Sequence, residues 1–114
     1  TVTPSFELEE RKGERIRFVG WLVTSRRVKT KTQEYMKFIT LEDRYGLCEA
    51  VMFPKVYSRF GHLVKGYGPY LISGRVQSRL PGEANLLVEE LAVVALSKPE
   101  LEGKFQKRLS QSIV

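Results

Sequence analysis

Apolar and polar residues alternate along most of this chain with a period of two rather than 3.6, which is typical of half-buried β-strands. Segments rich in β-branched and aromatic residues carry this pattern, and we predict strands at 16–24, 35–41, 47–53, 70–76 and within 85–96. The second and third strands are separated only by a short turn, so they are predicted to form a hairpin. Gly20, in the middle of the first strand, predicts a bend or bulge, which a small barrel needs where one strand serves both of its sides.

The spacing becomes helical between the third and fourth predicted strands. Pro54 can occupy the first turn of a helix, and Val56, Phe60 and Leu63 follow at three- and four-residue intervals. These positions predict an amphipathic helix of about ten residues. Three strands, one short helix and two further strands predict an all-β fold, the five-stranded Greek-key barrel called the OB-fold.

The predicted barrel occupies residues 15–96, with an N-terminal extension at 1–14 and a C-terminal tail at 97–114. Ser97 and Glu100 have the spacing of a helix capping box at the start of the tail. Apolar residues then recur on one helical face: Leu101, Phe105 and Leu109. Two interpretations of the tail stay open, a helix packed on the barrel and a frayed end.

Composition excludes several functional classes. The chain has 114 residues, 42% of them hydrophobic, which suits one compact domain. Cys48, the single cysteine, cannot form an intramolecular disulfide, and with the single histidine, His62, it cannot supply the three or four ligands of a zinc site. The apolar runs are far shorter than a membrane span of about 20 residues. We therefore expect no cofactor, no metal and no membrane partner, and a reducing, cytoplasmic setting.

Catalytic arrangements are also missing from the sequence. His62 falls in the predicted helix and has no nucleophile arranged beside it. The adjacent carboxylates Glu42 and Asp43 point to opposite faces of a strand, so they do not converge on one ion. We expect no catalytic residue and no small-molecule substrate in this segment. The sequence starts without methionine or a signal pattern, and we expect it to be part of a longer protein.

Positive charge is concentrated in the predicted barrel. The chain carries a net charge of +6, but residues 15–79 carry +9, because 13 Lys and Arg face only four Asp and Glu there. The densest cluster falls between the first two strands, in the predicted loop 25–34. A solvated polar loop is one interpretation of this cluster. An anionic partner is the other, and the lack of interleaved acids favours it.

OB-folds bind oligonucleotides across strands two and three, between the loops that join strands one to two and four to five. The predicted first loop supplies Arg26, Arg27, Lys29 and Lys31. Lys37 on strand two, Arg44 at the hairpin turn, Arg75 on strand four and Arg79 at the start of the second loop complete the basic set. Tyr35 and Tyr45 are candidates for base stacking, with packing as the alternative. The larger aromatic residues are expected in the core: Phe18, Trp21, Phe38 and Phe53.

Several strings of residues resemble one family. The most specific is Thr40-Leu-Glu-Asp43, followed by Gly46, Glu49 and Phe53-Pro54, and the strings at 20–25 and 70–76 agree with it. They resemble the OB domain of the bacterial DNA polymerase III alpha subunit. A looser version of the pattern occurs in the anticodon-binding OB domains of aminoacyl-tRNA synthetases.

The resemblance implies a non-catalytic module of a replicative DNA polymerase, a nucleotidyltransferase, that positions the single-stranded template. The implied partners are single-stranded DNA and the other domains of the parent polymerase. The family's basic first loop maps by position onto the cluster at 26–31, while Gln33-Glu34 departs from the usual glycine-containing turn. Two alternatives stay open: an anticodon-binding domain for tRNA, and a module that docks on other protein parts.

Overall fold

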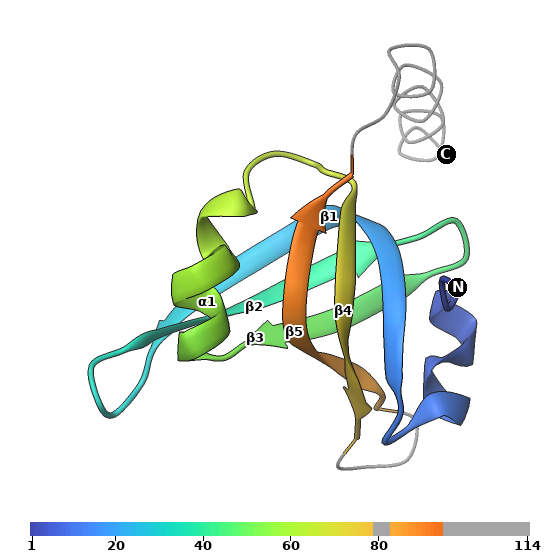
Figure 1. The fold of residues 1–114 in the computed structure, drawn as a ribbon, viewed down its shortest axis with the longest axis horizontal. Coiled ribbons are helices and arrows are strands. Elements are labelled where there is room, and N and C mark those ends of the chain that lie inside the picture. Colours follow the sequence, from blue (N-terminus) through green and yellow to red (C-terminus); the bar gives the residue numbers. More distant parts are fainter. Residues whose placement is uncertain (79–82, 95–114) are drawn as a thin grey trace.

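Five strands close into a barrel in the order β1-β2-β3-β5-β4 (Figure 1). The computed structural model describes residues 1–78 and 83–94. The strands are β1 (Arg15–Lys29), β2 (Tyr35–Glu42), β3 (Leu47–Met52), β4 (Tyr70–Gln77) and β5 (Asn85–Val93), and α1 (Pro54–Phe60) lies between β3 and β4. This confirms the predicted OB-fold barrel with its short helix. The predicted C-terminal helix and Arg79 lie outside the described residues, and the predicted domain limits stay predictions.

β1 serves both sides of the barrel. Its first part pairs with β4 and its second part with β2, and the change of partner falls at Gly20. A Cβ atom on Gly20 would lie 2.5 Å from a ring carbon of Phe18 and 2.9 Å from the carbonyl oxygen of Glu42, so only glycine allows this close approach. The ladder shifts register between Leu22 and Thr24. The predicted bend is therefore confirmed, and the bulge follows just after it.

Inward-facing side chains of all five strands fill the barrel. The largest that are fully buried are Tyr70, Phe18, Ile39, Leu41, Met52, Ile72 and Leu86. The Tyr70 hydroxyl donates to the carbonyl oxygens of Lys65 (2.8 Å) and Gly66 (2.9 Å), so its polar end is satisfied. The predicted ten-residue helix is α1 followed by the 3₁₀ helix η2 (Gly61–Leu63), and both pack apolar side chains against the barrel.

Two of the four large aromatic residues predicted in the core lie on the surface instead. Phe18 is fully buried and Trp21 is half-buried, but Phe38 is 37% and Phe53 46% exposed. Ile39 takes an inward position on β2, and because neighbouring side chains in a strand alternate, Phe38 must face outward. Phe53 lies beyond the end of β3, at the start of α1. The prediction of a core position is wrong for both.

The N-terminal extension forms the 3₁₀ helix η1 (Ser5–Arg11) and packs on the barrel through Leu8, which is 3% exposed. The backbone N–H and the hydroxyl of Ser5 each donate to the Asp43 carboxylate at 2.7 Å. These bonds tie η1 to the turn between β2 and β3. No helix in the described ranges is long and apolar enough to cross a membrane.

Candidate nucleic-acid interface

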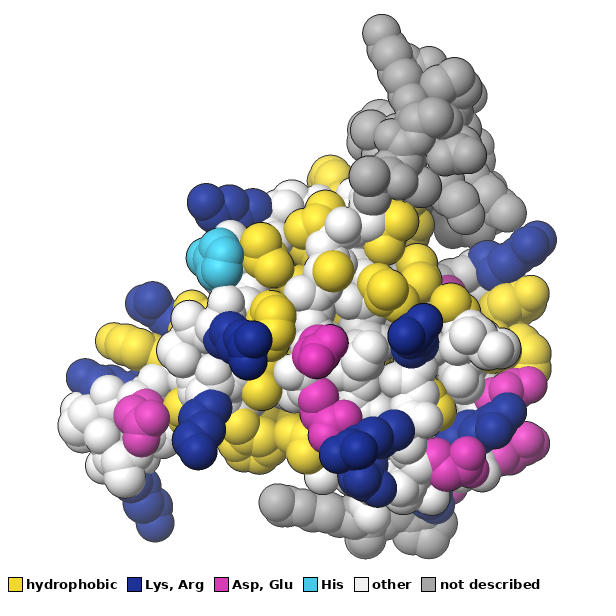
Figure 2. All heavy atoms as spheres, viewed as in Figure 1, with side chains coloured by type: hydrophobic (Ala, Val, Ile, Leu, Met, Phe, Trp, Pro, Cys, Tyr) yellow, Lys and Arg dark blue, Asp and Glu magenta, His cyan; other side chains and the backbone are white. Residues whose placement is uncertain are grey.

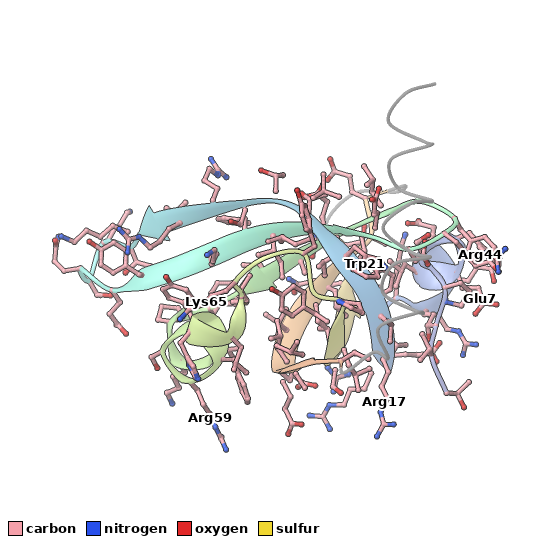
Figure 3. All side chains as sticks on the ribbon, turned by 90° about the horizontal axis from the view of Figure 1, so that it is seen from above. Glu7, Arg17, Trp21, Arg44, Arg59 and Lys65 are labelled. Atoms are coloured by element: carbon pink, nitrogen blue, oxygen red, sulfur yellow. The ribbon has the colours of Figure 1, made fainter. Side chains whose placement is uncertain are left out.

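The hairpin of β1 and β2 extends past α1, away from the barrel (Figures 1 and 3). Its ladder pairs Arg26 with Phe38, Arg27 with Lys37, and Lys29 with Tyr35. Three of the four basic residues predicted in the first loop therefore lie on a strand, and only Lys31 remains in the short loop 30–34. The predicted loop position is wrong because β2 supplies backbone partners for this polar stretch, and its aromatic rings pack against the basic side chains.

Alternation along β1 divides the basic residues between two faces of the hairpin. Arg26 lies on the outer face, where its Cζ is 5.1 Å from the centre of the Phe38 ring. Arg27 and Lys29 lie on the opposite face, where Arg27 Cζ is 4.4 Å and Lys29 Nζ 5.8 Å from the centre of the Tyr35 ring. Each distance suits a cation–π contact. The basic cluster of the sequence is thus two surfaces in the structure.

The second surface, which we call the α1-side face, faces the helix. Lys37 Nζ lies 5.9 Å from the centre of the Tyr57 ring on α1. Arg27 and Lys37 stand directly opposite each other across the ladder, and like charges in that position destabilise a sheet. Lys and Arg side chains surround this end of the molecule in Figure 2. An anion bound between Arg27 and Lys37 would relieve the repulsion between the two charges, so the α1-side face suits a phosphate.

A groove of about 660 Å³ lies on the outer face, where β2 and β3 meet the start of β5. Val51 is 6% exposed and lines the groove beside the accessible rings of Phe38 and Phe53. The full lining is Met36, Phe38, Glu49, Ala50, Val51, Phe53, Gln77, Glu83, Ala84 and Asn85. Its volume is in the range of ligand pockets, roughly 300–1,000 Å³. The alternation that places Ile39 inside could have revealed Phe38 as a surface residue.

Two carboxylates and two amides, those of Glu49, Glu83, Gln77 and Asn85, supply the polar groups of the groove. The Thr40 hydroxyl lies 3.3 Å from one and 3.2 Å from the other carboxylate oxygen of Glu49. The side-chain Oδ1 of Asn85 is buried and has no hydrogen-bond donor in the part of the chain that the structure describes. Ala50 on β3 pairs with Leu86 on β5, so Glu49 and Asn85, one residue earlier on each strand, are neighbours.

Three other candidate residues lie away from this groove. Arg44 and Tyr45 are on the turn between β2 and β3, at the opposite end of β2 from the loop 30–34 (Figure 3). The ring of Tyr45 packs edge-on against Phe6 of η1, with 4.9 Å between ring centres. Arg75 on β4 donates to the carbonyl oxygen of Gly13 at 2.7 Å. These contacts hold the N-terminal segment and need no nucleic acid to explain them.

The two groups with perturbed pKa values near the turn are structural as well. Burial raises the pKa of Asp43, but hydrogen bonds from Ser5, Tyr45 and Gly46 outweigh burial, and the net pKa lies below its ordinary value. Burial raises the pKa of Cys48 to about 12, so the thiol stays protonated and unreactive at neutral pH. Within residues 1–78 and 83–94, no group of three or more His, Cys, Asp and Glu could hold a metal ion.

The curated relatives of this chain are DNA polymerases. DNA polymerase III subunit alpha of Halalkalibacterium halodurans is 32% identical over 93 residues, which cover 81% of this chain and 8% of that protein. An error-prone DNA polymerase of Anaeromyxobacter dehalogenans is 34% identical over 79 residues, covering 68% of this chain and 7% of that protein. The chain thus spans less than a tenth of the length of these relatives.

Solved structures with the same barrel include an aminoacyl-tRNA synthetase and a domain of replication protein A. Asparaginyl-tRNA synthetase of Pyrococcus horikoshii matches with a TM-score of 0.67 and 28% identity, over 89% of this chain and 25% of that one. A domain of replication protein A from Methanococcus maripaludis matches with a TM-score of 0.61 and 17% identity, over 73% of this chain and 86% of that one, and shows the fold alone. Residues 16–94 match the family described as OB-fold nucleic acid binding domain, and the chain belongs to that family.

Proposed function

We propose that this chain is a non-catalytic module of a bacterial replicative DNA polymerase and holds single-stranded template DNA. The observation that carries the proposal is the groove on β2 and β3, where the exposed rings of Phe38 and Phe53 lie next to the basic hairpin. The DNA polymerase relatives support DNA as the partner. A cytoplasmic location and docking on the other domains of the parent polymerase belong to the same proposal.

Two kinds of contact would hold the strand. Bases stack on accessible aromatic rings, which contributes roughly 1–3 kcal/mol per base and tolerates any sequence. Phosphates lie against Arg26 on the outer face and against Arg27, Lys29 and Lys37 on the α1-side face, and they release counterions there. If about four phosphates are neutralised, the logarithm of the association constant falls against the logarithm of salt concentration with a slope near −3, taking ~0.7 per phosphate of a single strand.

The stacking contact is tested by Phe38→Ala, with Phe6→Ala as the matched control. Phe6 is 62% exposed but lies on η1, outside the groove. Fluorescence polarisation with a labelled single-stranded oligomer should show that Phe38→Ala weakens binding about 5- to 150-fold, the loss of one stacking contact of roughly 1–3 kcal/mol. Phe6→Ala should leave affinity unchanged. Equal affinities for the wild type and Phe38→Ala would remove the groove from the binding site.

A second candidate is binding of a tRNA anticodon loop. It is favoured by the match to asparaginyl-tRNA synthetase, a solved structure with 28% identity over most of this chain. Single-stranded loops with unstacked bases use the same combination of aromatic rings and basic side chains. Affinities for an anticodon stem-loop and for single-stranded DNA of matched length, measured at one salt concentration, separate the two candidates. Tighter binding of the stem-loop would favour tRNA.

A further inference from the structure

We propose that the groove holds a single nucleobase and selects guanine, an inference that rests on the proposed binding of single strands. The selection comes from hydrogen-bond acceptors that lie beside the exposed rings of Phe38 and Phe53. Glu49, Glu83 and Asn85 bring carboxylate and amide oxygens to the lining, next to Phe38 and Phe53. A base stacked in the groove would therefore present its edge to a row of acceptors.

The ladder places these groups at a suitable spacing. Phe38 stands opposite Val51, and Thr40 stands opposite Glu49. Glu49 is therefore the diagonal cross-strand neighbour of Phe38 on the outer face, and such neighbours are about 7–8 Å apart. A ring stacked on Phe38 can span that distance with its edge toward Glu49. Asn85 lies next to Glu49 on β5 and lines the same groove. Its Oδ1 atom is buried, so it becomes a second acceptor for that edge when the side chain turns toward the groove.

Both acceptors have unused capacity. An ionised carboxylate only accepts hydrogen bonds. The Thr40 hydroxyl has one proton to donate to Glu49, which leaves most of the carboxylate lone pairs free. Asn85 Oδ1 is buried without a donor within the described residues, and such a group is costly unless a ligand supplies one. The site thus requires a base with N–H groups side by side.

Guanine has that edge, because its ring N1–H and its 2-amino group are adjacent donors. Thymine has one ring N–H between two carbonyl oxygens, and those oxygens would face the acceptors. Adenine and cytosine each have an amino group beside a ring nitrogen that itself accepts. Gln77, also in the lining, carries an amide donor that suits the O6 atom of guanine. Bases are recognised through such edges when a single strand exposes them.

The same carboxylates separate bases from phosphates. Glu49 and Glu83 repel phosphate groups from the groove, while Arg26, which lies beside Phe38 on the same face, attracts them. A strand is thereby oriented with a base inward and its backbone along the hairpin. This accounts for two carboxylates inside a groove that adjoins the most basic part of the chain.

The test compares three deoxythymidine oligomers of about nine nucleotides, a length typical of one OB-fold. The central base is guanine, hypoxanthine or thymine. Hypoxanthine lacks only the 2-amino group of guanine, so the pair isolates one donor. We expect the guanine oligomer to bind at least about fivefold tighter than either of the others, the low end of discrimination by a paired base contact.

Two variants locate the source of the preference, and a third controls for charge. Glu49→Gln keeps the side-chain length but loses the bidentate acceptor, and Asn85→Ala removes the buried oxygen. Each should reduce the guanine preference to less than about twofold, while thermal unfolding verifies the fold. Glu90→Gln removes the same charge from an exposed position of β5 outside the groove lining and should keep the preference.

The outcomes for the two proposals differ. If none of the three oligomers binds, the proposed function fails and the inference with it. If all three bind with equal affinity, the proposed function stands and the guanine selection is refuted. A guanine preference that persists in both Glu49→Gln and Asn85→Ala would also refute it, because the discrimination would then arise elsewhere.

Discussion

The α1-side face of the hairpin makes a quantitative prediction about salt dependence. Arg27, Lys29 and Lys37 lie on this face with Tyr35 and Tyr57, and none of the three is needed by the barrel core. Each phosphate contact on a single strand contributes about 0.7 to the log–log salt slope. Replacing all three with Ala should therefore reduce the slope by about 2, from near −3 to near −1. Replacing Arg26 alone should reduce it by about 0.7.

The assay is fluorescence polarisation of a labelled deoxythymidine oligomer at several salt concentrations, from low to moderate. A matched control replaces Lys12, at the end of η1, and Arg15 and Arg17, at the start of β1, with Ala (Arg17 is labelled in Figure 3). This control removes the same charge away from the hairpin. If binding depended only on the overall positive charge, both triple variants would change the salt slope equally. If phosphates contact the hairpin directly, only the hairpin variant changes it. Identical slopes for the hairpin triple variant and the wild type would refute the placement of phosphates on the α1-side face.

The fold of the hairpin variant is checked at the same time. Arg27 and Lys37 are opposed like charges, so their removal should leave the midpoint of thermal unfolding unchanged or slightly higher. A loss of binding together with a large fall in that midpoint would point to unfolding instead. In that case Arg27→Gln and Lys37→Gln are tested singly, because each removes one positive charge but keeps a polar side chain on the hairpin.

Three further predictions concern stability and reactivity. A Cβ on Gly74 would clash with the carbonyl oxygen of Leu87, so Gly74→Ala should destabilise the fold by roughly 1–3 kcal/mol in denaturant titration, and an unchanged midpoint would contradict the close approach. The pKa of Asp43 is lower in the folded state than its ordinary value. The ionised Asp43 carboxylate therefore stabilises the fold at a pH above its ordinary pKa, and this stabilisation is lost as the pH falls through the lower folded value. The midpoint of thermal unfolding should fall as the pH is lowered below about 4. Asp43→Asn, which weakens the bonds to Ser5, should make that fall smaller. Because burial raises the pKa of Cys48 to about 12, iodoacetamide at pH 8 should label the unfolded but not the folded chain, and rapid labelling of the folded chain would refute its burial.

Local chemistry alone was enough to predict the barrel. The period of two, the turn residues and Pro54 act between near neighbours in the chain. They predicted β2 to β5, the start of β1 and the start of α1 close to their observed bounds, but not the end of β1 at Lys29. The bend at Gly20 was predictable for the same reason. The concentration of positive charge near the first two strands was also a property of the sequence. So was the lack of a second cysteine that could form a disulfide with Cys48.

Tertiary structure decided which surface of the barrel each candidate side chain occupies. Pairing with β2 extended β1 to Lys29 and turned a predicted loop into a two-sided hairpin. Packing of Ile39 into the barrel placed Phe38 on the outer face, although its place in an apolar strand had favoured the core. The closure of β3 against β5 brought Glu49 beside Asn85, two positions that no local pattern connects. A sequence determines which segments become strands because that depends on near neighbours, whereas the groove depends on which strands meet, and only the closed barrel settles that.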